Sequence, residues 1–167
     1  MSDLLKPVVD TFLTNTRVLP MALEDFSPAD AVRRSGGDQG NSPIFLAAHL
    51  TTVRYNILAM AGQPEENPWW ERFGATAVCT DGADYPSVAE VVDAWKAISD
   101  KLHAAFDGFD DAQAMQALSE DNRLPAVERT QRGAFGFMAW HETYHIGQIA
   151  MLRTAYGLPG LTTKMRR

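Results

Sequence analysis

The sequence of 167 residues contains one cysteine, Cys79, which excludes an internal disulfide and any need for an oxidising compartment. It also lacks an apolar run near the roughly 18 residues that a membrane-spanning helix requires. Its first residues, MSDLLKPVVDTFL, lack the basic region followed by an apolar region that marks a secretory signal. We therefore expect a cytoplasmic protein with no membrane partner.

Positive charge is also scarce, because 15 Lys and Arg stand against 21 Asp and Glu and give a net charge of −6. Nucleic-acid affinity comes mainly from Lys and Arg that neutralise phosphates, so we expect no nucleic-acid partner. The chain is 46% hydrophobic and 22% charged, as in globular proteins, and its length fits one domain over residues 1–167.

Strand patterns are missing as well, since the nearest candidate, VCT at 78–80, is too short. Apolar residues instead recur at helical spacings in four segments. Ser42 and Pro43 predict the start of a helix, and Ser87 with Glu90 predicts a capping box at the start of another. The predicted helices cover about 3–23, 43–62, 87–106, and 126 or 130 to 156, with short helical pieces after Ser27-Pro28 and around 110–118. The sequence predicts an all-α four-helix bundle.

The connection between the second and third helices is long. It covers about 25 residues from Gly62 to Ser87, whereas a hairpin between antiparallel helices needs only about 2–8. In extended form it could cross the roughly 30 Å length of a 20-residue helix. The sequence therefore permits the second and third helices to run parallel.

Three of the four histidines lie on apolar helix stripes. His141 and His145 are one turn apart in the line Phe135, Met138, His141, His145, Ile149, Leu152, and His49 lies beside the inward stripe of the second helix. A lone inward histidine is more often a satisfied core residue. Burial of each ring without a hydrogen-bond partner would reduce the stability of the fold by roughly 1–3 kcal/mol. A divalent cation would bind one nitrogen of each of the three rings and remove this penalty. We predict a metal site of His49, His141 and His145, and an edge or surface position for His103.

The segment HETYH also matches the H-E-x-x-H pattern of zinc metalloproteases, in which the Glu is a general base. The following metzincin positions hold Gln148 and Met151, no Asp or Glu follows Glu142, and no edge strand is predicted. Peptide cleavage is therefore poorly supported. Because Glu142 lies about 100° round the helix from His141, we expect it to point away from the metal, at the surface or beside the ligands.

The segments NSPIFLAAHLTTVRYNILAMAG and WHETYHIGQIAMLRTAYGLPG, including the HxxxHxGQ pattern, resemble the DinB-like superfamily, which includes YfiT-like proteins and thiol-dependent S-transferases. The resemblance covers the whole chain in helix order. It implies a bundle with up-down-down-up order, a metal triad of His49, His141 and His145, and frequent homodimers. It also implies one divalent metal ion, zinc or nickel and less often iron, and a low-molecular-weight thiol as cosubstrate.

A site of three neutral imidazoles leaves the metal its full charge and an open position, where water or a thiol becomes a nucleophile near neutral pH. We therefore expect a divalent-metal-dependent enzyme, a thiol-dependent S-transferase or a hydrolase acting on a small-molecule substrate. The alternatives are a non-catalytic metal-binding or stress-related ligand-binding protein, and a structural bundle.

Three residues are weak candidates for a catalytic role beside the metal: Glu142 as a base, Tyr55 as a hydrogen-bond donor to a metal-bound ligand, and Gln148 as a donor one turn beyond His145. Other residues are softer candidates. Trp69 and Trp70 would line a pocket mouth or cap the bundle, and Gly147 would admit a neighbouring helix. Cys79 would be a thiol nucleophile, although nothing near it in the sequence indicates a lowered pKa.

Overall fold

Four long helices make up most of the protein. The computed structural model describes residues 1–166, and at Asp38 it describes the backbone alone. They are α1 (Lys6–Leu23), α3 (Pro43–Met60), α5 (Val88–Asp107) and α7 (Gln131–Ala155). Short helices are α2 (Pro28–Val32), η1 (Gly37–Gln39), α4 (Trp70–Phe73), α6 (Asp111–Ala114) and α8 (Leu161–Met165). The described residues form no strand, only an isolated bridge between Ala117 and Thr130. The prediction of an all-α bundle is confirmed.

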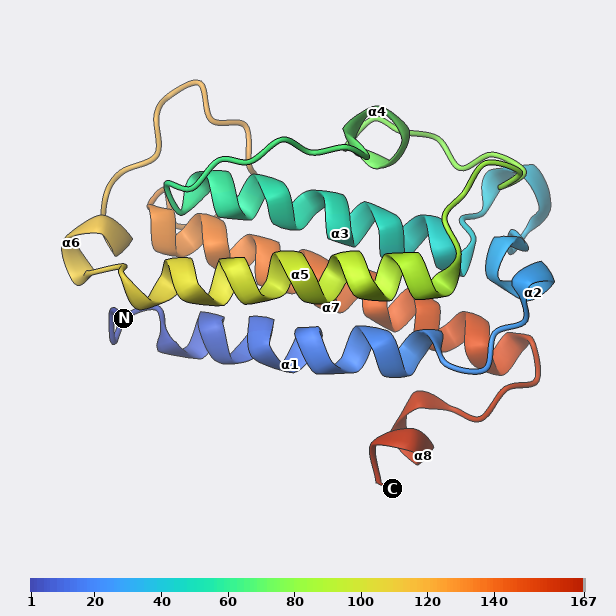
Figure 1. Ribbon diagram of the computed structural model, residues 1–167. Coiled ribbons are helices and arrows are strands. Elements are labelled where there is room, and N and C mark those ends of the chain that lie inside the picture. The colour runs from blue at the N-terminus through green and yellow to red at the C-terminus, as the bar shows by residue number, and fades with distance from the viewer. Residues whose placement is uncertain (167) are drawn as a thin grey trace.

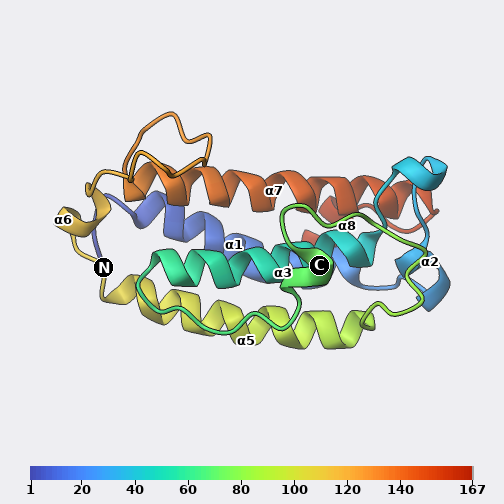
Figure 2. The ribbon, with the colours of Figure 1, turned by 90° about the horizontal axis from the view of Figure 1, so that it is seen from above.

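The long helices follow up-down-down-up order (Figures 1 and 2). α1 and α7 run one way, and α3 and α5 run the other. The connection after α3 makes this possible, because it returns along the outer side of α3 and carries α4 with it before α5 begins (Figure 1). The long crossover predicted from the sequence is confirmed.

Side-chain caps fix where the helices begin. The Ser42 hydroxyl accepts the Phe45 N–H at 3.3 Å, and Ser87 and Glu90 form a complete capping box. The Thr130 hydroxyl accepts the Gly133 N–H at 3.2 Å, so α7 begins at Gln131 and not at Ala126. Two of the three starts were predicted from the Ser, Pro and Glu that occupy capping positions, and the third agrees with the later of its two predicted starts, Thr130.

The core has two large apolar layers with a polar layer between them, and a small third cluster of Leu58, Ile98 and Ala105 from α3 and α5. Leu19, Leu50, Trp95 and Ile146 belong to the layer at the α2 end, together with other residues of all four long helices. Phe12, Ile57, Phe106 and Phe135 belong to the layer at the α6 end. On every long helix, buried polar residues separate the two layers: Asn15, Arg54, Ser99 and Glu142. Among the described residues, no helix has the length and apolar character needed to cross a membrane.

Candidate metal centre

Three histidines meet on one side of the bundle, between α3 and α7. The Nε2 atom of His141 lies 3.4 Å from Nε2 of His49 and 3.1 Å from Nε2 of His145. One nitrogen from each ring falls within 4.8 Å of the others. His141 and His145 come from successive turns of α7, and His49 comes from the facing turn of α3, so the predicted convergence of the three rings is confirmed.

The outer ring nitrogens of two histidines are already bonded. Nδ1 of His49 donates to the Phe73 carbonyl at 2.8 Å, and Nδ1 of His145 donates to Oε1 of Gln148 at 2.6 Å. Because these acceptors require Nδ1 to carry the proton, both Nε2 atoms present a lone pair to the centre. Nδ1 of His141 is buried and has no hydrogen-bond partner in the described part of the chain.

The donor set fits a divalent cation. Ligand nitrogens at zinc distance in tetrahedral geometry are separated by about 3.3 Å, close to the two Nε2 separations. Without a cation, the one proton that Nε2 of His141 can carry reaches only one of the two Nε2 lone pairs that face it. The lone pair of the remaining histidine then has no donor. A cation bound by His49, His141 and His145 removes this conflict.

Burial keeps the three rings neutral. Burial lowers the pKa of His141 to about 4, and the neighbouring His145 and His49 add to this effect. Burial also lowers the pKa of His49, against the opposing effect of the Phe73 carbonyl, and the pKa of His145, against that of Gln148. Neutral imidazole is the form that binds metal, so at neutral pH all three rings are ready to coordinate.

The histidines line a hollow of about 290 Å³. Its other walls are mostly apolar or small: Asn41, Phe45, Leu46, Gly74, Ala75 and Ala77. No Asp or Glu lines the hollow among the residues whose side chains are described. A small molecule could therefore reach the Nε2 atoms without meeting a carboxylate.

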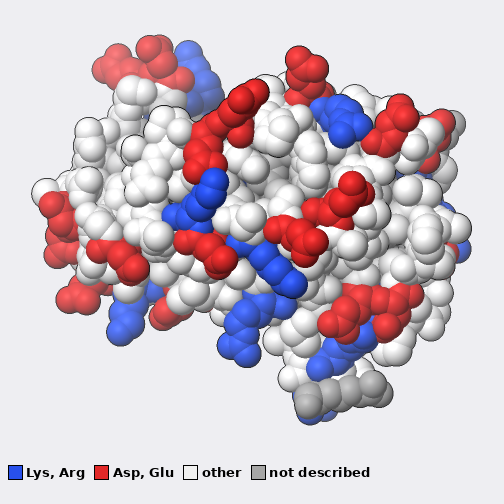
Figure 3. Space-filling view, viewed as in Figure 1, with Lys and Arg blue, Asp and Glu red and all other residues white. Residues whose placement is uncertain are grey.

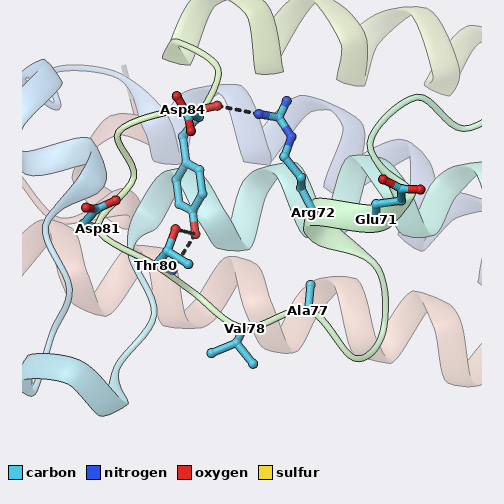
Figure 4. A pocket seen from close by; sticks show the side chains of 8 residues that line it. Glu71, Arg72, Ala77, Val78, Thr80, Asp81 and Asp84 are labelled. Carbon is cyan, nitrogen blue, oxygen red and sulfur yellow. Dashed lines mark hydrogen bonds between the residues drawn. The ribbon is translucent and has the colours of Figure 1, made fainter.

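A second hollow, of about 260 Å³, adjoins the first at Ala77 (Figure 4). Hydrogen bonds hold its walls in place. Nη1 of Arg72 donates to the Asp84 carbonyl at 2.6 Å, and the Thr80 N–H donates to the Tyr85 hydroxyl at 2.7 Å. These bonds fix the connection that contains α4, and α4 supplies the carbonyl that orients His49.

Glu142 points away from the histidines as expected, but it is fully buried, so of the two positions expected for it the one at the surface is wrong. Its carboxylate accepts two hydrogen bonds from Arg54, which is equally buried, at 2.8 and 2.9 Å. Asn15 donates to the same carboxylate at 3.2 Å. The carboxylate points away from the histidines because its position on α7 faces the bundle axis, and both oxygens are engaged there.

Arg54 is a residue that the sequence did not single out. Its guanidinium donates to Thr16 and the Phe12 carbonyl of α1 and to Ser99 of α5, and it lies 3.5 Å from the centroid of the Trp95 ring. This side chain of α3 thus contacts each of the other three long helices. The available signal was a lone arginine in the apolar stretch of the second predicted helix.

Gln148 and Tyr55 have different surroundings. Gln148 lies beside His145 as expected, but its Oε1 accepts a hydrogen bond from the ring, and its Nε2 donates to the Tyr144 hydroxyl at 3.3 Å. Tyr55 packs against Leu58, Ile98 and Ala105, and it does not line the histidine hollow. His103 is half-buried at the edge of α5, where Nε2 lies 3.3 Å from the Thr16 hydroxyl, in agreement with the edge position predicted.

The remaining candidates lie away from the hollow. Trp69 packs on Phe73 with ring centroids 6.0 Å apart, and Trp70 is largely exposed, so neither lines the histidine hollow. Cys79 is buried in the apolar layer at the α2 end, where it is sheltered from reagents. Gly147 has no atom within 4 Å of an added Cβ, so the expectation of a close helix is wrong within the chain.

The fold and the triad together define a class of protein, the four-helix bundles in which histidines of two helices can bind a divalent metal. The profile of the DinB superfamily matches residues 11–149, a range that includes all three histidines. The chain belongs to the DinB superfamily. A comparison with functionally curated proteins gives no match.

Proposed function

We propose that this protein is a divalent-metal-dependent enzyme that uses a small thiol to attack a small-molecule electrophile. The observation that carries the proposal is the convergence of three Nε2 atoms at the wall of a hollow large enough for a small molecule. Three protein ligands with an accessible side are typical of catalytic metal sites, whereas structural sites are closed by a fourth ligand. Zinc or nickel suits three imidazoles, and iron is a further candidate.

The walls of the hollow favour a thiol over water as the nucleophile. A bound divalent cation supplies Lewis acidity, which promotes loss of a proton from a thiol or from water. No carboxylate among the described side chains lines the hollow to accept that proton, and Glu142 is held by Arg54. A free thiol has a pKa near 8.5, far below that of free water, so a thiol bound to the cation would lose its proton to solvent more completely than bound water would and needs no protein base.

The other residues of the hollow have supporting roles in this proposal. Phe73 and Gln148 hold the rings of His49 and His145 through their Nδ1 atoms, which keeps both Nε2 lone pairs directed at the cation. Phe45 and Leu46 provide apolar walls that exclude water from the reacting groups. Asn41 offers an amide for a polar group of the substrate.

The proposal is tested in two stages with purified protein. Elemental analysis of wild type beside His145→Ala should give one metal per chain that is lost in the variant. The protein is then loaded with cobalt and titrated with low-molecular-weight thiols, and a sulfur-to-cobalt charge-transfer band should appear. His103→Ala is the matched control, because this histidine lies away from the hollow, and it should behave as wild type.

Each stage can contradict the proposal. If wild type neither contains metal nor takes it up, the metal site itself is wrong. If the metal is present but no thiol gives a charge-transfer band, the thiol chemistry is wrong. The alternative of a non-catalytic metal-binding or ligand-binding protein would then apply, since it requires the site but no exchangeable ligand.

A further inference from the structure

The hollow of Figure 4 contains charges of both signs that do not pair with one another, and we call it the charged hollow. Three carboxylates line it, those of Glu71, Asp81 and Asp84, and Arg72 adds one guanidinium. Nη1 of Arg72 donates to the backbone carbonyl of Asp84 at 2.6 Å. Among the described residues, Arg72 forms no ion pair with any of the three carboxylates. Both kinds of charge therefore remain available to a ligand.

Elsewhere on the surface, opposite charges pair directly. Figure 3 shows Lys and Arg side chains lying against Asp and Glu over the face that α1 and α5 present. Nζ of Lys101 lies 2.5 Å from the Glu65 carboxylate, and Nζ of Lys164 lies 2.6 Å from that of Glu24. A guanidinium that shares a hollow with three carboxylates and pairs with none of them distinguishes the charged hollow from this surface.

The walls of the charged hollow are held in fixed positions. The Tyr85 hydroxyl accepts the Thr80 N–H at 2.7 Å, and the Tyr85 ring packs on the Phe73 ring with centroids 5.2 Å apart. The turn before Tyr85 requires Gly82, because its φ is 81° and an added Cβ would lie 2.8 Å from Cβ of Val32. The charged side chains thus come from a segment with a fixed backbone, which reduces the entropy that a ligand must lose on binding.

The charged hollow has room for one part of a ligand. Its volume is about 260 Å³, whereas pockets that hold a whole drug-sized ligand have about 300–1,000 Å³. It adjoins the histidine hollow, of about 290 Å³, at Ala77, which lines both. One ligand can therefore place its reacting end beside the histidines and its other end among the charges.

We propose that the charged hollow binds the α-amino-acid end of the substrate, where an ammonium and a carboxylate share one carbon. Such a group needs a cation and an anion side by side. Arg72 and Asp84 provide them, because the guanidinium of Arg72 is hydrogen-bonded to the backbone of Asp84. Glu71 and Asp81 add negative charge, which favours the ammonium and disfavours a ligand that is only an acid. The substrate class is therefore an α-amino-acid derivative.

The inference rests on the proposed function, because the reacting end of the same molecule must reach the cation in the histidine hollow. It assigns the end of the substrate that the histidines do not contact. Arg72 binds the carboxylate of this end, and Asp84 binds its ammonium. Neither residue lines the histidine hollow, so both determine specificity and take no part in the reaction.

Four hydroxamates test the inference on protein loaded with cobalt, since a hydroxamate binds the metal and alters the visible spectrum of cobalt. Glutamic acid γ-hydroxamate carries both charges of the α-amino acid. Its analogues are γ-aminobutyrohydroxamate, with the ammonium alone, glutaric acid monohydroxamate, with the carboxylate alone, and butyrohydroxamate, with neither. The compound with both charges should bind at least about tenfold more tightly than butyrohydroxamate, because it adds hydrogen bonds between charged groups. The same four compounds lengthened by one or two methylene groups cover a longer reach.

Two variants separate the two charges. Asp84→Asn should weaken binding of the compounds that carry an ammonium by at least about tenfold and should not weaken glutaric acid monohydroxamate, because the backbone carbonyl that holds Arg72 remains. Arg72→Gln should weaken the compounds that carry a carboxylate relative to butyrohydroxamate. The ratio is the measure here, since a loosened connection would weaken all four compounds equally. Arg123→Gln removes an exposed charge between α6 and α7 and is the control, which should bind all four as wild type.

The outcomes separate this inference from the proposed function. If the protein takes up no cobalt, or if butyrohydroxamate leaves the cobalt spectrum unchanged, the proposed function is wrong and the inference with it. If butyrohydroxamate binds and the compound with both charges binds no more tightly at any length, the inference alone is overturned. Equal losses for all four compounds in Asp84→Asn would also overturn it, since the aspartate would then act through the structure of the connection.

Discussion

At His49 and His145, the hydrogen bond made by Nδ1 determines whether Nε2 carries a lone pair that can bind a cation. A carbonyl and an amide oxygen accept the Nδ1 protons, so the tautomer that binds a cation exists before any cation arrives. His141 lacks such a partner, and its position is set by α7 and by the two rings beside it. The triad is therefore two oriented ligands with a third between them.

Replacing Gln148 by Ala should weaken metal binding by about 10–100-fold, the usual effect of removing a hydrogen-bond partner of a ligand. The cause is lost orientation of the His145 ring, since Gln148 does not contact the site where the Nε2 atoms meet. Competition with a chromophoric chelator measures the affinity. Gln113→Ala, on α6, is the control and should bind as wild type.

The metal-free protein should lose stability as pH falls from about 7 toward 4. The pKa of His141 is about 4 in the folded protein and 6.5 without the fold, so between these values the unfolded chain binds more protons. Urea unfolding with chelator at several pH values measures the effect. His141→Leu should lose less stability over the same range, and parallel curves for the two proteins would contradict the assignment.

At the scale of the helices, the polar layer ties the bundle together at the level of the triad. Arg54 lies on α3 one turn beyond His49, and Glu142 follows His141 on α7, so the ion pair joins the two helices that carry the ligands. A buried pair of this kind fixes one relative position of two helices, because any slip leaves charges unpaired. The register of the three histidines follows from that position.

Arg54→Met should destabilise the protein by about 3–5 kcal/mol, because it leaves the Glu142 carboxylate buried without its partner. The double variant Arg54→Met with Glu142→Leu should recover most of this loss, since no charge then remains buried. Urea unfolding measures both. Equal losses in the single and double variants would show that the arginine acts through its packing on Trp95 alone.

The helices and the histidine triad could be predicted from the sequence because both depend on local spacing. Caps such as Ser42 and Ser87 mark helix starts, and His141 and His145 must share a face. The Phe73 carbonyl could not be predicted, because every residue has one and only the path of the connection brings this one to His49. The Glu142 contacts were missed because the spacing of a helix says which side a residue faces and not what lies there.

At the scale of the molecule, the connection from α3 to α5 both sets the topology and completes the site. It crosses the outer side of α3, and its α4 turn supplies the acceptor for His49. The hydrogen bonds of Arg72 and Tyr85 keep this segment in place. A change in the position of the His49 ring should therefore alter the mobility of the connection, because the ring is hydrogen-bonded to the Phe73 carbonyl.

Metal loading should slow hydrogen exchange in the connection around Phe73 and Gly74. Coordination holds the His49 ring, and the ring holds the Phe73 carbonyl at 2.8 Å. Exchange with mass-spectrometric detection, with and without zinc, measures the change. The α6 region, at the other end of the bundle, is the internal control, and equal slowing there would mean general stabilisation instead of a local effect.

The separation of His49 from His141 along the chain has a consequence for folding. The two residues are 92 positions apart, so a cation that binds both closes a loop of more than half the chain. A disulfide that closes a loop of this size contributes about 4–5 kcal/mol by restricting the unfolded chain. In a protein with a single cysteine, the metal would act as a cross-link that acid or a chelator can open and neutral pH can restore.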